Sequence, residues 1–286
     1  MPTSALSARR PEVHGHRGCR GLRPENTLPA FLYALRLGVD VLELDVVISQ
    51  DEQVVVSHEP WLVPHLGPDP DGQPVDPAPS QRAQYSLYQW PYATIRQCRV
   101  GEVPLAAFPE QLPVPSYRPL LREVLAATEA ATRQLGRPAV GYSIEIKSDL
   151  AHEGIFQPSP TPLVELVLAE LSAAQVLART TLLSFDPRVL QAARLTHPSL
   201  ALCLLLETAP LPRAPFTTLG FVPETLGPAW RLLSAARVRQ LRADYPALRL
   251  VPWTVNEPAD LRRVLAWGVE GITTDYPDRL IRLLGC

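Results

Sequence analysis

The chain has 286 residues, which is enough for a sizeable core, and α/β barrels of this length commonly form one domain. Its 27 basic and 29 acidic residues leave a net charge of −2, so there is no basic field for nucleic acid. No apolar run reaches the length of a membrane span, and the first residues lack the hydrophobic core of a signal peptide. We therefore expect a cytoplasmic protein without an integral membrane segment.

Cysteine and lysine usage adds two observations. The four cysteines show no metal-type spacing and are expected to be reduced thiols: Cys19, Cys98, Cys203 and Cys286. Lys147 is the single lysine among the 27 basic residues. The other basic residues are all arginine. This bias suggests that arginine stands wherever either residue will serve, so Lys147 is expected where a compact ammonium is needed and a planar guanidinium would not fit.

The N-terminal part reads as strand, loop, helix and strand. A short strand over Glu12 to His16 runs into a turn with two glycines, and Asn26 or Thr27 can cap a helix over Leu28 to Leu37. Glu25 and Asn26 are expected to serve this cap rather than to brace Arg17. The order of elements favours a parallel α/β architecture.

The stretch from Val39 to Pro60 predicts a β-hairpin. Glu43 and Asp45 lie two residues apart and therefore share one face of the first strand. A turn centred between Asp51 and Glu52 places Asp45 opposite His58. Two adjacent carboxylates repel unless a cation or a proton lies between them, so the pattern favours a metal site or acid/base chemistry.

From Glu59 to Pro119 the pattern changes, because this segment carries 13 of the 32 prolines and no sustained period. A compact domain rarely has so long an irregular segment without a function. We interpret residues 59–119 as an insertion after the second strand that caps the site. Its aromatic residues argue against a disordered linker.

Regular alternation then continues to the C-terminus. Val140 to Lys147 is a predicted strand that places Glu145 and Lys147 on one face, and further strands are expected over Thr180 to Phe185, Leu200 to Glu207, Thr217 to Val222, Arg249 to Val255 and Gly271 to Thr274. Helices are expected between them. The total of eight strands predicts a TIM (β/α)₈ barrel within a single domain, residues 11–286.

Sites in such barrels lie where the strands end. The side chains expected to meet there are His16, Arg17, Glu43, Asp45, Glu145 and Lys147, with His58 brought back by the hairpin. Three carboxylates suit one Mg²⁺ or Ca²⁺ ion, two histidines can move protons, and Arg17 with Lys147 can hold an anion. This set suits a phosphate ester. Trp253, at a strand end, could form an apolar wall of the substrate pocket, although core packing is nearly as good an explanation.

The motifs HRGCRGLRPENT, ELD, SHEP, EIK, SFD, PWTVN and TDYPD, in this order, resemble those of the glycerophosphodiester phosphodiesterase family. The resemblance runs from about Pro11 to the C-terminus. It implies a TIM barrel and a metal-dependent hydrolysis of glycerophosphodiesters to glycerol phosphate and an alcohol.

Position by position, the resemblance implies that His16 and His58 are the acid/base pair and that Glu43, Asp45 and Glu145 are metal ligands. It also implies phosphate contacts from Arg17 and from Lys147. Glu59 departs from the pattern, because the family more often has aspartate after the second histidine, and its role is left open.

Two alternatives remain at this point. A lysophospholipase D activity on the same barrel would need an apolar rim, which Trp61, Leu62, Val63 and Trp90 could supply. A non-catalytic barrel that binds phosphodiesters or a partner is the other. The sequence leaves open the alcohol released, the choice of Mg²⁺ or Ca²⁺, direct water attack or a cyclic phosphate, and the oligomeric state.

Among the other polar residues, His14 is expected to be buried and hydrogen-bonded. His65, His152 and His197 are expected at the surface. Asp186 and Asp275 are expected to be helix N-caps.

Overall fold

The computed structural model describes residues 10–75, 78–208 and 216–285. Within them, eight parallel strands form one sheet in the order β8-β7-β6-β5-β4-β2-β1-β9. These strands are β1 (Glu12–Gly15), β2 (Val41–Ile48), β4 (Gly141–Ile146), β5 (Thr180–Ser184), β6 (Ala201–Leu206), β7 (Thr225–Pro228), β8 (Arg249–Leu250) and β9 (Gly271–Thr274).

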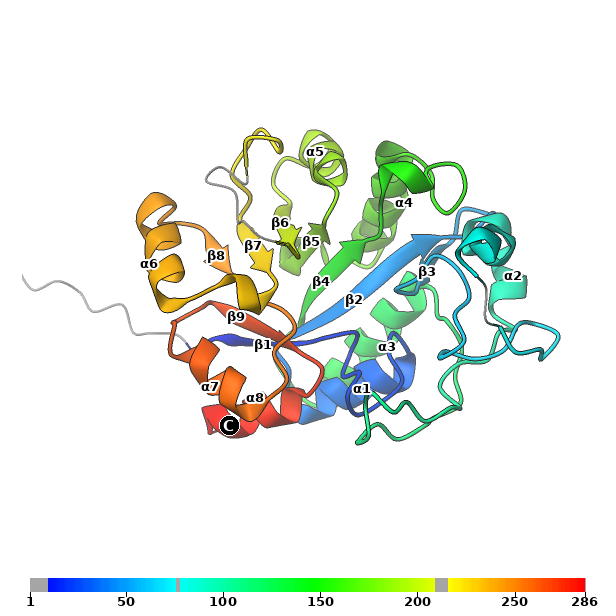
Figure 1. Ribbon diagram of the computed structural model, residues 1–286, viewed down its shortest axis with the longest axis horizontal. Helices are drawn as coiled ribbons and strands as arrows, with labels where there is room; N and C mark the ends of the chain where they lie inside the picture. The colour runs from blue at the N-terminus through cyan, green and yellow to red at the C-terminus, as the bar shows by residue number, and fades with distance from the viewer. Residues whose placement is uncertain (1–9, 76–77, 209–215, 286) are drawn as a thin grey trace, which may run out of the picture.

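The two end strands of this order also come together. The Glu270 amide donates to the Leu250 carbonyl at 3.1 Å, and the Thr273 amide donates to the Pro252 carbonyl at 3.0 Å. These bonds nearly close the sheet into a barrel, with helices on its outside (Figure 1). The predicted TIM-type fold is confirmed.

The helices are α1 (Leu28–Leu37), α2 (Tyr92–Ile95), α3 (Leu121–Gln134), α4 (Pro160–Ala173), α5 (Pro187–Thr196), α6 (Ala235–Asp244), α7 (Pro258–Leu265) and α8 (Pro277–Leu284). On β2, Leu42, Leu44 and Val46 belong to the main hydrophobic core, which includes buried residues of the helices. Because side chains alternate along a strand, Glu43 and Asp45 point to the opposite face, inside the barrel.

Thr27, rather than Asn26, caps α1. Its hydroxyl accepts a hydrogen bond from the Ala30 amide, and the helix ends at Gly38, whose φ of 109° is left-handed. Asn26 and Glu25 are therefore available for other contacts.

The segment between β3 (Val54–Val56) and α3 contains two 3₁₀ helices, η1 (Pro79–Tyr85) and η2 (Leu87–Gln89), and the short α2. It carries its own small apolar clusters, one of which joins Leu62, Leu87 and Ile95 to Val55 of β3. Figure 1 shows this cyan and green segment lying at one side of the barrel, beyond the end of β2.

The hairpin register differs from the prediction by one residue. Val46 pairs with Val56, and the Ser57 amide donates to the Asp45 carbonyl at 3.0 Å, so Asp45 does not face His58 in the ladder. The tight loop between Ser49 and Gln53 accounts for the difference, with Glu52 in the left-handed region at φ 58°. The chain leaves the ladder after Val56, and this lets His58 still reach the barrel mouth.

The predicted strand over Thr217 to Val222 is wrong. Phe216 and Leu219, three residues apart, are both buried, and the Gly220 amide donates to the Phe216 carbonyl at 2.8 Å. This is one helical turn, ended by Gly220 at φ 83°. The strand, β7, follows at Thr225–Pro228. β8 is also shorter than predicted, and Trp253 lies beyond it in an isolated bridge to Ala229.

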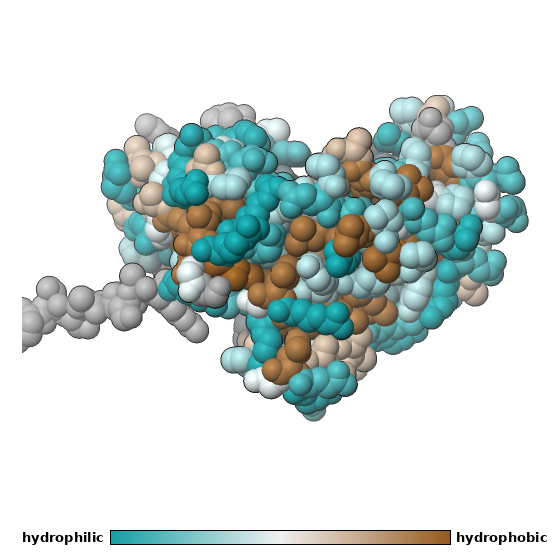
Figure 2. Space-filling model, turned by 90° about the horizontal axis from the view of Figure 1, so that it is seen from below, coloured by the Kyte–Doolittle hydropathy of each residue, from teal (hydrophilic) through white to brown (hydrophobic). Residues whose placement is uncertain are grey.

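The molecular surface mixes polar and apolar residues. Figure 2 shows the face seen from below Figure 1, where hydrophobic patches are interrupted by hydrophilic residues and the outline is hollowed between two lobes. In the described ranges, no helix combines the length and the apolar character that crossing a bilayer requires.

Candidate active site

Three buried carboxylates meet inside the barrel. Asp45 of β2 pairs in register with Glu145 of β4, and Glu43 lies one inward position lower on β2. Their exposed fractions are 1%, 7% and 3%, in that order. Oxygen atoms of all three lie within 4.8 Å of one another. The structure therefore brings the three acids together as predicted.

The three acids have different charged neighbours, so the pKa values of Asp45 and Glu43 shift in opposite directions. The Lys147 ammonium lies 2.8 Å from Asp45 Oδ1 and 2.5 Å from Glu145 Oε1. Burial would raise the pKa of Asp45, but Lys147 and Arg17 outweigh it and hold the pKa well below its usual value. Burial, and then the charge of Asp45, raises the pKa of Glu43 well above its usual value.

This donor set fits a hard divalent cation. Carboxylate oxygens are the ligands that Mg²⁺ and Ca²⁺ prefer, and a cation near Glu43 would relieve the repulsion that raises its pKa. Glu43, Asp45 and Glu145 are the residues that could hold it.

His16, at the end of β1, forms a buried pair with Asp275. The His16 Nδ1 atom lies 2.6 Å from Asp275 Oδ1. Burial lowers the pKa of His16 to about 4, although Asp275 acts in the opposite direction. The bond to Asp275 leaves Nε2 of His16 free, and this atom lies 3.9 Å from Glu43 Oε2.

Asp275 was expected to be an N-cap, and this expectation is wrong. The N-cap of α8 is Tyr276, without a side-chain hydrogen bond. Besides His16, the Asp275 carboxylate accepts hydrogen bonds from Arg20 at 3.0 Å and from Asn256 at 2.7 Å. Asp186, by contrast, caps α5 as predicted.

His58 forms a second pair of the same kind. Its Nδ1 atom lies 2.6 Å from Glu59 Oε1. Burial opposes ionisation of Glu59, but the hydrogen bond and the charge of His58 lower the pKa of Glu59 to about 2. Glu59, whose role the sequence left open, thus occupies Nδ1 of His58.

Arg17 is held by a tight turn. Its backbone is left-handed at φ 49°, and its amide donates to Glu43 Oε2 at 2.8 Å. The guanidinium donates to Glu25 at 2.7 Å. A side chain at Gly18 would meet the Ala30 backbone at 2.8 Å, so the turn requires glycine. Glu25 braces Arg17, contrary to the expected capping role.

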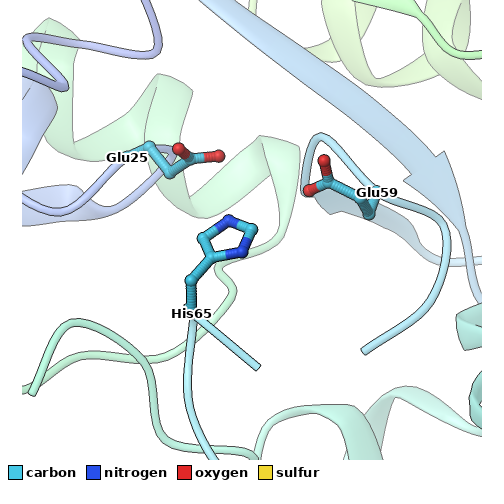
Figure 3. A group of neighbouring side chains, drawn as sticks. All are labelled: Glu25, Glu59 and His65. Atoms are coloured by element: carbon cyan, nitrogen blue, oxygen red, sulfur yellow. The ribbon is translucent and has the colours of Figure 1, made fainter. Parts of the chain in front are cut away.

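Glu25, Glu59 and His65 form a further cluster, in which nitrogen and oxygen atoms lie within 4.8 Å of one another. Figure 3 shows the His65 ring between the two carboxylates. Glu25 already pairs with Arg17 and lies 3.6 Å from an Arg20 nitrogen, while Glu59 pairs with His58. Both carboxylates are thus already paired with positively charged or catalytic side chains. We therefore interpret the cluster as holding Arg17 and His58 in place rather than as a metal site. His65 is exposed, as predicted.

A cavity of about 930 Å³ opens at this site. The predicted site residues that line it are the two histidines, the two cations, two of the three acids and the tryptophan: His16, His58, Arg17, Lys147, Glu43, Glu145 and Trp253. Trp253 contacts a small cluster of Leu183, Cys203 and Leu205, separate from the main core. It therefore lines the cavity and packs at the same time.

The remaining expectations have mixed outcomes. His14 is buried and lies within hydrogen-bonding distance of Ser143, as predicted. Cys19, Cys98 and Cys203 are buried free thiols, whereas Cys286 lies outside the described residues. Trp61 packs on Phe156 and His152 and does not line the cavity.

Comparison with known proteins identifies the family of the chain. A model of the family described as "Glycerophosphoryl diester phosphodiesterase family" matches residues 16–279. A glycerophosphodiester phosphodiesterase of Bacillus subtilis is 27% identical over 276 residues, covering 92% of this chain and 83% of the relative.

Two solved structures have a similar fold. One, from Silicibacter pomeroyi and ascribed to the glycerophosphoryl diester phosphodiesterases, is 32% identical with a TM-score of 0.82, over 96% of this chain and 93% of the other. The other is an Oleispira antarctica phosphodiesterase in complex with the product sn-glycerol-3-phosphate. It is 19% identical with a TM-score of 0.73, over 97% of this chain and 98% of the other.

Proposed function

Since the chain belongs to the glycerophosphoryl diester phosphodiesterase family, whose members are hydrolases, we propose that it hydrolyses glycerophosphodiesters by two-histidine acid/base catalysis with one divalent cation. The products are glycerol phosphate and an alcohol. The observation that carries this proposal is the meeting of two histidine–carboxylate pairs and three buried acids around one cavity.

Glu43, Asp45 and Glu145 would hold the cation, either Mg²⁺ or Ca²⁺. When bound, it would supply positive charge for the non-bridging oxygens of the phosphate. Arg17 and Lys147 both line the cavity, and we propose that they bind the same phosphate oxygens. Arg17 would do so through two parallel hydrogen bonds and Lys147 as a compact positive charge.

The two histidines divide the proton transfers. His16 has a pKa lowered to about 4 by burial, so it is neutral at pH 7 and suited to take a proton at Nε2 from the attacking oxygen. His58 would then protonate the leaving alcohol. Asp275 and Glu59 would fix the ring orientations, and Asp275 also favours the imidazolium that His16 becomes during the cycle.

We also assign the segment over residues 59–119 the role of a cap. It contributes Glu59 and His65 to the supports of the catalytic candidates. A cap of this kind would limit water access and shape the pocket for the alcohol.

The test is hydrolysis of a panel of glycerophosphodiesters before and after metal removal. We expect glycerol phosphate release that stops with a chelator and returns with Mg²⁺ or Ca²⁺. Unchanged turnover after verified metal removal would contradict the metal assignment, and no turnover on any substrate would favour a binding protein. A single turnover in labelled water separates direct attack from a cyclic phosphate.

A further inference from the structure

Arg20 lies at the mouth of the barrel on the same turn as Arg17, and it lines the cavity. Its side chain is 20% exposed. The guanidinium donates to Asp275 through two atoms, from Nε to Oδ1 at 3.0 Å and from Nη2 to Oδ2 at 3.4 Å. A two-point contact of this kind fixes the plane of a carboxylate as well as its position.

Asp275 shares one oxygen between Arg20 and His16. Its Oδ1 atom accepts the Nε bond of Arg20 and lies 2.6 Å from His16 Nδ1, while Asn256 donates to Oδ2 at 2.7 Å. Burial would raise the pKa of Asp275, but His16 and Arg20 outweigh it and hold the pKa well below its usual value. The carboxylate therefore stays charged, and Arg20 helps to set the orientation in which it meets the His16 ring.

Arg20 also approaches the carboxylate that holds Arg17. Its Nη1 atom lies 3.6 Å from Oε2 of Glu25, and Oε1 of Glu25 accepts the hydrogen bond from Arg17 at 2.7 Å. Each of the three guanidinium nitrogens of Arg20 thus faces a carboxylate oxygen of the protein. This arrangement suits a residue that orders the site better than one that binds the phosphate.

Residues 59–119, which we call the cap segment, hold Arg20 at both its side chain and its backbone. The guanidinium carbon lies over the Phe108 ring, 4.7 Å from its centroid. The Gln111 side chain, which is buried, donates to the Arg20 carbonyl at 2.6 Å. Only a planar cation can stack on the ring and pair with a carboxylate through two atoms at the same time.

We propose that Arg20 is a positioning residue that links the cap segment to the assigned base: the cap segment holds Arg20, and Arg20 holds Asp275 against His16. The inference rests on the proposed function, because it takes His16 as the residue that receives a proton from the attacking oxygen. It gives the cap segment a part in ordering the base, in addition to covering the pocket.

The first experiment measures kcat and KM of Arg20→Gln on glycerophosphocholine with saturating Mg²⁺ or Ca²⁺. We expect kcat to fall about tenfold or more, with KM within about twofold of wild type. Arg23→Gln is the matched control, because Arg23 lies on the same turn, stacks on Tyr33 at 3.9 Å and does not line the cavity. It should keep the wild-type kcat. A raised KM with unchanged kcat in Arg20→Gln would overturn the inference.

Double variants show whether the effect passes through the proposed contacts. In an Asp275→Asn background, Arg20→Gln should lower kcat by less than about twofold further. Phe108→Leu should lower kcat roughly two- to fivefold in wild type and leave it unchanged in Arg20→Gln. Phe221→Leu, which removes a similar ring from Arg194, is its control and should be neutral. Losses that multiply in either double variant would overturn the inference.

A measurement without turnover separates this inference from the proposed function. The ¹⁵N chemical shift of His16 Nδ1, in protein labelled at histidine, reports the bond to Asp275, and its signal is the one that His16→Asn removes. We expect this shift to change in Arg20→Gln and in Phe108→Leu but not in Arg23→Gln. Such a change supports the inference even if the wild type hydrolyses no glycerophosphodiester. An unchanged shift overturns it even if glycerophosphocholine is hydrolysed.

Discussion

The Nδ1 atom of His16 lies 2.6 Å from Oδ1 of Asp275, although the two residues stand 259 positions apart in the chain. The contact exists because β1 pairs with β9, so the first and last strands of the barrel end side by side. Asp275 thereby contacts Nδ1 of His16, and His16 lines the cavity while Asp275 does not.

Asp275→Asn should therefore lower turnover. An amide can leave the His16 ring in the wrong tautomer and cannot favour its imidazolium, so we expect kcat to fall about 10²–10⁴-fold with KM changed much less. Steady-state kinetics on glycerophosphocholine measure this. Asp186→Asn is the matched control, because Asp186 caps α5 and does not line the cavity. Equal losses in both variants would show a merely structural role.

The pH profile of Asp275→Asn should also move. Asp275 raises the pKa of His16 against the larger effect of burial. Removing its charge therefore lowers the pKa of His16 further, so the neutral base persists to lower pH. The acidic limb of kcat/KM should shift to lower pH relative to wild type. A shift to higher pH would contradict the assignment of His16 as base.

Glu59 should act on His58 in the same way. Glu59→Gln removes the charge next to His58 Nδ1 and is expected to lower kcat about 10²-fold or more. Glu59→Asp keeps the charge on a shorter side chain and should retain more activity than Glu59→Gln. If the two variants are equally impaired, side-chain reach rather than charge decides the role of Glu59.

Lys147 should not tolerate arginine. Its ammonium contacts Asp45 and Glu145 at 2.8 and 2.5 Å in a buried space, where a larger planar group would displace both acids. We expect Lys147→Arg to lose about 10²-fold or more in kcat/KM and to bind Mg²⁺ or Ca²⁺ more weakly in calorimetric titration. Arg122→Lys, at an exposed pair with Glu170, is the control and should be neutral. Wild-type activity in Lys147→Arg would contradict the need for a compact cation.

The sequence predicted the barrel and most of the site because local signals carry them. Alternation on β2 and β4 placed Glu43, Asp45 and Glu145 on inward faces, and the strand ends placed His16 and Lys147 at the mouth. The predicted strand over Thr217 to Val222 failed because Leu219 is buried together with Phe216, three residues before it and outside the predicted strand, and residues three apart share a face in a helical turn but not in a strand.

The carboxylates that hold His16 and Arg17 in place were harder to predict, because they depend on contacts that the local sequence pattern does not show. The local sequence around Asp275 predicts a helix cap. Asp275 reaches His16 only because β1 and β9 pair side by side in the barrel. The signal was present, since the first and last strands of a closed barrel must be adjacent. Glu25 was likewise assigned to a helix cap, while the turn at Arg17 directs its guanidinium to Glu25.

The most direct test of the account is the turnover of His16→Asn and His58→Asn on a glycerophosphodiester at saturating Mg²⁺ or Ca²⁺. We predict that kcat falls at least about 10²-fold in each variant, while the affinity for the cation, measured by calorimetry, stays near that of wild type. Wild-type turnover in either variant, with the cation bound, would contradict two-histidine catalysis at this site.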